Sequence, residues 1–458
     1  MTQPAFTRLR CAGWLSLGLT AAAGLLFAPV ARAAEGDEPL EETWQFHAQS
    51  TWNTQRHRAF GAQASGPNSL TAAADSMYTF SATAMPGWRP WRGGELYLNV
   101  EAASGVPFTG NLVGLGGFTN GEITRAAGTD LMLYRQRLFL RQTWQLGGEI
   151  ETISSGFNQL AGRLSHDRFT LTVGNFSTLD VIDPNRYAKD PRTQFMNWSH
   201  WTYAAYDYAA DARGFGWGAM GEWIRGDWAL RFGRMTGPRD PNGLPVDPAL
   251  AIHYGDQLEV EHNHHLGDQP GAVRLMVWRN RAVLARFEDA LSWLQAHPGN
   301  YSGPDALLAS RRSEQFKQGL GLNLEQALGP DTGLFLRAMQ ADGQTETHAF
   351  TEVDNSLSLG LSMQGSRWGR PDDGVGVALA RNGLSADRRR FLAAGGISFF
   401  IGDGMLDYAP ETIAESYYSV GLGHDFAVTL DWQHIRNPAF NAARGPVDVL
   451  ALRLHAEL

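Results

Sequence analysis

The chain has 458 residues, a formal net charge of −9 and a single cysteine, Cys11. An acidic chain without a basic cluster is a poor binder of nucleic acid, and one cysteine cannot build a disulfide framework. With 52 Gly, 15 Trp, 12 Tyr and 23 Phe, the composition is also unusual for a soluble enzyme.

The N-terminus has the pattern of a secretory signal peptide. Two arginines precede an apolar run from Trp14 to Val30, and residues 31–33, Ala-Arg-Ala, supply a small-x-small cleavage site. We predict that residues 1–33 are a signal peptide and that residues 34–458 form a single domain. No later segment approaches the ~18 consecutive apolar residues of a transmembrane helix. Two classes then remain: a soluble all-β protein or an outer-membrane β-barrel.

Segments with alternating apolar and polar residues recur along the mature chain. Trp44, Phe46 and Trp52 begin the series, and a row of alternating apolar residues from Leu450 reaches Leu458. The segments run about 9–11 residues, the length that a tilted strand needs to cross a bilayer. Short connections alternate with very long ones, as in an outer-membrane barrel. The pattern predicts an all-β fold, a transmembrane antiparallel β-barrel with long outer loops.

One insertion breaks the strand pattern. In residues 283–296, Val283, Phe287, Leu291 and Leu294 recur at helical spacing. We predict a short amphipathic helix within a long loop. Loop-length statistics favour a loop that folds on itself over a docking element.

The first candidates for the lining of a lumen lie on two neighbouring segments. Four polar residues alternate with leucines and therefore face away from lipid: Glu95, Tyr97, Asn99 and Glu101. Three arginines share one parity in the next segment: Arg135, Arg137 and Arg141. An arginine facing lipid costs about 2–4 kcal/mol near the midplane, so we expect all three to face inward, opposite the glutamates. The alternative is a ladder of compensated charges that stiffens the wall and meets no substrate.

Further candidates follow two Asp-Pro steps and lie in later loops. Asp190 and Arg192 are candidates to narrow a pore, with Trp198 as a ring on which a sugar stacks; the alternative is a folded-in loop held by its own salt bridge. Glu352, Asp354 and Arg370 are candidate lumen charges, and a solvated turn is the alternative.

A series of sequence blocks runs in order through the mature chain: Val173–Asp180, Asp190–Ser199, Tyr208–Ala219, Ala349–Ser356, Trp368–Ser385, Phe391–Gly404 and Asn437–Val447. Together these blocks resemble the carbohydrate-selective porins of the OprB family. The resemblance implies a sixteen-stranded outer-membrane barrel that admits mono- and small oligosaccharides, although eighteen strands remain the alternative count. Asn175, where we expect Lys, and the final Leu458, in place of Phe, depart from the family pattern.

We therefore predict passive diffusion of carbohydrates through a polar, charged lumen in the outer membrane of a Gram-negative bacterium. The expected partners are small sugars and outer-membrane lipid, with no nucleic acid and either a homotrimer or a monomer. No P-loop, HExxH or dinucleotide fingerprint occurs, so we predict no enzyme, cofactor or metal. A general non-selective porin is the nearest alternative, followed by an outer-membrane enzyme and a soluble β-sheet lectin.

Overall fold

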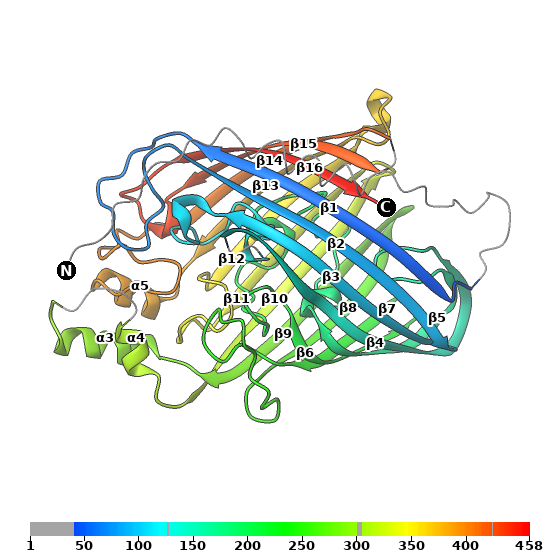
Figure 1. The fold of residues 1–458 in the computed structure, drawn as a ribbon, viewed down its shortest axis with the longest axis horizontal. Coiled ribbons are helices and arrows are strands. Elements are labelled where there is room, and N and C mark those ends of the chain that lie inside the picture. Colours follow the sequence, from blue (N-terminus) through cyan, green and yellow to red (C-terminus); the bar gives the residue numbers. More distant parts are fainter. Residues whose placement is uncertain (1–40, 126–127, 300–304, 424) are drawn as a thin grey trace.

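The structure, a computed structural model, describes residues 41–458 except 126–127, 300–304 and 424. The predicted signal peptide lies outside the described residues. Sixteen antiparallel strands form a closed barrel in which each strand pairs with the next and β1 pairs with β16 (Figure 1). The predicted barrel is confirmed, with sixteen strands and not eighteen.

The strand and helix bounds follow from the pairing. The strands are β1 (Trp44–His57), β2 (Asp75–Trp91), β3 (Gly94–Val106), β4 (Gly128–Ile153), β5 (Gly162–Phe176), β6 (Gly216–Arg225), β7 (Trp228–Met235), β8 (Tyr254–Leu266), β9 (Gln269–Val283), β10 (Glu314–Gly329), β11 (Thr332–Ala341), β12 (Asn355–Gln364), β13 (Gly374–Gly383), β14 (Glu411–Gly421), β15 (Phe426–Arg436) and β16 (Val447–Glu457). The helices are α2 (Trp198–Trp201), α3 (Phe287–Ala296), α4 (Asp305–Ser310) and α5 (Ala386–Ala393). None of the helices in the described part of the chain is long and apolar enough to cross a membrane.

The outward and inward faces of the barrel wall differ in polarity, because successive side chains of a strand point to opposite faces. On β9, the outward Leu275 and Val277 are exposed, whereas the inward Arg274 and Met276 are buried. An apolar surface therefore faces outward around the barrel, and the polar and small residues face inward.

Long connections gather at one end of the barrel, and mostly short turns at the other. Helices α3, α4 and α5 lie at the long-loop end (Figure 1). The predicted helical insertion starts later than expected: Val283 still belongs to β9, where it pairs with Glu314, and α3 begins at Phe287. The ring of Phe287 lies 5.4 Å from that of Phe391 on α5, so the insertion packs against neighbouring loop helices.

A β-bulge in β4 changes which residues face inward. Asn99 pairs with Arg137 and Val100 pairs with Arg135, so Gln136 is an extra residue on β4. The side chains on either side of the bulge therefore follow opposite parities. Arg137 faces inward with Gln136, and Arg135 is exposed on the outer face with its guanidinium 5.1 Å from the Trp217 ring. The expectation that Arg135 faces inward is wrong, because alternation cannot be carried across a bulge.

Candidate permeation pathway

Residues 177–215, which connect β5 and β6, fold into the barrel; we call them the inner loop. The Met196 amide donates to Glu415 on β14 (2.5 Å), and Arg453 on β16 donates to the Pro191 carbonyl (2.8 Å). In the sixteen-stranded ring β14 lies eight strands from β6, where the loop ends, and is therefore on the opposite side of the barrel. The inner loop therefore spans the lumen.

Asp183 anchors the inner loop to β10 and β11. Its carboxylate accepts from Arg337 Nε on β11 (2.8 Å) and from Asn323 on β10 (2.5 Å). Its backbone has a left-handed φ of 58°, a conformation that Asp adopts more readily than most residues. The following Pro184 lacks an amide N–H, so the Asp183-Pro184 segment has one fewer backbone donor that needs a hydrogen-bond partner inside the barrel.

The inner loop has an apolar interior of its own. Phe195, Trp198 and Tyr203 are fully or almost fully buried. The Trp198 indole N–H donates to the Ala204 carbonyl (3.2 Å), and its ring contacts the rings of Trp201, Tyr208 and Phe350. The loop is therefore packed as a small core and is not a strand connection exposed to water.

A buried ion cluster joins the inner loop to the wall and to the β3–β4 connection. Arg192 donates to Glu101 on β3 (2.8 Å) and to Glu122 (2.9 Å). Glu101 also accepts from Thr83 (2.6 Å) and Gln136 (2.5 Å). Burial opposes the charge on Arg192, but Glu122 and then Glu101 raise its pKa above the usual value. With side-chain exposures of 6% for Arg192 and 0% for Glu101, this cluster fixes the loop and offers little surface to a solute.

A second set of charges on the same side of the barrel is more accessible. Arg137 makes two hydrogen bonds to the Asp180 carboxylate (2.8 and 2.7 Å), and their side chains are 14% and 29% exposed. Further down β4, Arg141 lies 3.6 Å from Glu95 on β3, with exposures of 25% and 14%. We call these four residues the lumen row. It offers guanidinium donors beside carboxylate acceptors along one strand.

Aromatic rings underlie the guanidiniums of this side of the lumen. Arg137 lies 5.0 Å from the Phe215 ring and Arg141 lies 5.4 Å from the Tyr97 ring. Nearer the long-loop end, Arg213 lies 4.2 Å from the Tyr134 ring. Such cation–π contacts place each guanidinium against a ring and leave N–H groups for other partners.

A family model described as "Carbohydrate-selective porin, OprB family" matches residues 68–458. The chain belongs to this family. The sixteen-stranded barrel of this porin also resembles the structure of OprB from Pseudomonas putida at high pH, with a TM-score of 0.64 and 14% identity over 91% of this chain and 94% of that one. The outer membrane channel DcaP of Acinetobacter baumannii gives a TM-score of 0.50 and 7% identity over 91% and 97%. At these identities the likeness concerns the fold alone.

The sequence matches none of the curated proteins with which it was compared. The family match is sufficient to confirm the predicted channel: this is a carbohydrate-selective porin of the Gram-negative outer membrane. Its long-loop end therefore faces the outside of the cell, and its short turns face the periplasm.

Four predicted lumen residues of the porin have other roles. Trp198 is 4% exposed, so its ring is closed to a sugar, because the loop around it forms a core. Glu352 and Asp354 are buried and bind Arg388 of α5, in a contact between loops. Arg370 lies at the periplasmic end, in the β12–β13 turn, where it binds Asp373 (2.6 Å). The observed position of Arg370 matches the alternative interpretation from the sequence, a solvated turn.

The remaining predicted residues lie near the lumen row but are mostly covered. The Tyr97 hydroxyl donates to Glu95 (2.9 Å) and accepts from the Leu160 amide (3.0 Å). Asn99 is fully buried, and its amide has no hydrogen-bond partner among the described residues. Asp190 accepts from the Arg192 amide (2.8 Å), which shapes the inner loop locally.

Sequence analysis missed two members of this region, Asp180 and Phe215. Both belong to blocks that resemble the family, Val173–Asp180 and Tyr208–Ala219. Nothing in their local pattern distinguishes them from ordinary loop residues. Across the described ranges, no group of three or more His, Cys, Asp or Glu side chains is arranged to hold a metal ion.

Proposed function

We propose that sugars cross this porin along the lumen row, Arg137 with Asp180 and then Arg141 with Glu95. The observation that carries the proposal is the contrast in exposure. The Arg137 and Asp180 side chains are 14% and 29% exposed, whereas Arg192 and Glu101 on the same side of the barrel are 6% and 0% exposed. A solute in the remaining space meets the first pair more readily than the second.

The lumen row suits a hydroxylated solute. A sugar hydroxyl donates to a carboxylate and accepts from a guanidinium, so each ion pair can replace part of the hydration shell. The two ion pairs, one at each arginine of β4, offer successive weak sites, and transport requires that the solute leave each site easily. No bond is made or broken, and we propose that the protein is a passive channel without catalytic activity.

The competing interpretation is that these pairs only stiffen the wall. In that case the inner loop sets the width of the passage. Replacing the charged side chains of the lumen row by neutral ones would then change the solute size limit but not the preference for sugars. The two interpretations differ in the ratio of sugar to non-sugar flux, which is therefore the quantity to measure.

Liposome swelling with purified protein tests the proposal. Arg137→Gln combined with Arg141→Gln is expected to lower the permeation of glucose several-fold relative to an amino acid of similar size. Arg135→Gln is the matched control, since this arginine lies on the same strand but on the outer face, and it should leave both rates unchanged. An unchanged ratio in the double variant would reject the lumen row as the sugar path.

A further inference from the structure

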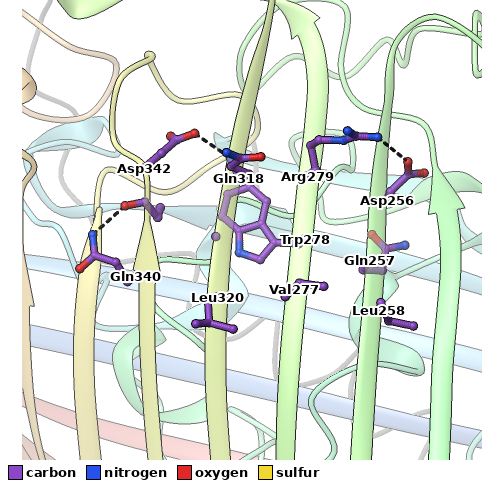
Figure 2. Close-up of a pocket in the computed structure, with 12 residues that line it drawn as sticks. Asp256, Gln257, Leu258, Val277, Trp278, Arg279, Gln318, Leu320, Gln340 and Asp342 are labelled. Atoms are coloured by element: carbon purple, nitrogen blue, oxygen red, sulfur yellow. Dashed lines mark hydrogen bonds and ion pairs between the residues drawn. The ribbon is translucent and has the colours of Figure 1, made fainter.

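The outer wall carries a groove across β8 to β11, close to the long-loop end (Figure 2). Its apolar part is formed by Leu258, Val277 and Leu320, which are direct neighbours in the strand register. Their side chains are exposed, as expected for a surface that faces acyl chains. This part of the groove is thus a lipid-facing surface.

The next outward row of the same strands is polar. Asp256, Arg279 and Gln318 pair across β8, β9 and β10, directly beside the three apolar residues. Figure 2 shows Arg279 directed toward Asp256, with Val277 and Leu320 on the apolar side. At the β11 end of this row, the Asp342 carboxylate accepts a hydrogen bond from the Gln318 backbone N–H (3.2 Å). The change from apolar to polar residues within two positions of one strand marks the boundary of the hydrocarbon layer.

Two arginines of β9 converge at this boundary. Arg279 and Arg281 are two residues apart on a strand and therefore share the outer face. Both guanidiniums lie over the Phe316 ring, at 5.1 and 5.9 Å. Arg279 is 47% exposed and Arg281 is 30% exposed, so both remain open to a ligand.

The acidic neighbours leave hydrogen-bond donors of this cluster open. Asp256 already makes two hydrogen bonds to Arg234 (2.7 and 2.9 Å) and lies 3.7 Å from Arg279, beyond hydrogen-bond distance. Arg281 has one ion pair, with Glu314 (3.1 Å). Asp256, Glu314 and Asp342 equal the three guanidiniums in number, but Asp256 is bound by Arg234 and Asp342 by the Gln318 backbone N–H, so N–H donors of Arg279 stay open to a ligand.

We propose that this groove binds a phosphorylated glycolipid of the outer leaflet, with a phosphate between Arg279 and Arg281 and an acyl chain over Val277 and Leu320. Guanidinium groups match the geometry of phosphate oxygens and make paired, charge-assisted hydrogen bonds to them. The groove lies at the end that faces the cell exterior, so its lipid comes from the outer leaflet. This site is separate from the lumen and does not depend on which residues conduct sugar.

The test is a titration of detergent-solubilised protein with bisphosphorylated lipid A, followed by native mass spectrometry. Arg279→Gln with Arg281→Gln should weaken binding by at least about tenfold, since two charge-assisted contacts are lost. Arg436→Gln is the matched control: this arginine is also exposed at the long-loop end, at the last residue of β15, but lies outside the groove. It should bind lipid A as the unaltered protein does.

Two further measurements make the outcome decisive. Dephosphorylated lipid A should bind the unaltered protein as weakly as the double variant binds lipid A, and sugar permeation should be the same in all variants. Equal binding of lipid A by the double variant would overturn the proposal. Equal binding of phosphatidylglycerol and lipid A would also overturn it, because the groove would then select any anionic lipid.

Discussion

The buried cluster of Arg192, Glu101 and Glu122 gives the sharpest prediction about the inner loop. Arg192→Met removes the cation that Glu101 and Glu122 share and weakens the compensation of both carboxylates inside the barrel. At N···O distances of 2.8 and 2.9 Å, each contact represents a gross attraction of about 6 kcal/mol at an effective dielectric constant near 20. Most of that attraction offsets desolvation. The expected net loss of stability is about 3–5 kcal/mol, as for other buried pairs that lose one partner.

The consequence should be visible in conductance as well as in stability. Arg192 is one of the main links between the inner loop and the β3 side of the barrel, so its loss should release that side of the loop. In planar bilayers we expect a larger and noisier single-channel conductance for Arg192→Met. In detergent, the variant should unfold at a lower denaturant concentration.

A triple variant separates charge from packing. Glu101→Gln and Glu122→Gln, added to Arg192→Met, remove the two carboxylate charges that Arg192 binds and should recover most of the stability, because neutral groups of similar volume often replace buried ion pairs without cost. If Arg192→Met changes neither conductance nor unfolding, the ion cluster does not hold the loop. If the triple variant is no better than the single one, packing and not charge explains the loss.

Two further predictions concern the interior of the inner loop. Trp198→Ala should cost about 3–5 kcal/mol in the free energy of unfolding and leave the sugar to amino-acid flux ratio unchanged, whereas loss of that ratio would show that the ring meets sugar. His348, in the β11–β12 connection, packs beside the inner loop, and burial lowers its pKa from 6.5 to about 4. Between these values only the unfolded chain binds the proton, so stability falls as the pH is lowered, by about 2 kcal/mol from pH 7 to 5. His348→Gln should remove that part of the pH dependence in denaturant titrations, and an unaltered slope would contradict this assignment.

The barrel could be predicted from the sequence because the face of each strand residue is a local property. The alternation from Trp44 onward needs no knowledge of the partner strand. The same logic failed at Arg135, because a single parity was carried across the bulge at Gln136. The outward leucines change parity there, from Leu131 and Leu133 before the bulge to Leu138 and Leu140 after it, and Arg135 follows the first pair.

The site was less predictable, because its partners come from distant parts of the chain. Arg141 lies near Glu95, as the two facing segments suggest, but Glu101 binds Arg192 of the inner loop. Trp198 was misplaced for a related reason. A polar segment with two Asp-Pro steps normally lies in water, and only the enclosure by strands on all sides turns it into a core.

The anchoring of the inner loop has a consequence for assembly. Its contacts reach Glu101 on β3 and Arg453 on β16, which are brought together only when the barrel closes between β1 and β16. The loop therefore cannot take its final place while the sheet is still open. Closure of the seam between β1 and β16 and narrowing of the passage therefore occur together. A closed barrel in the membrane then does not present a wide, unselective channel.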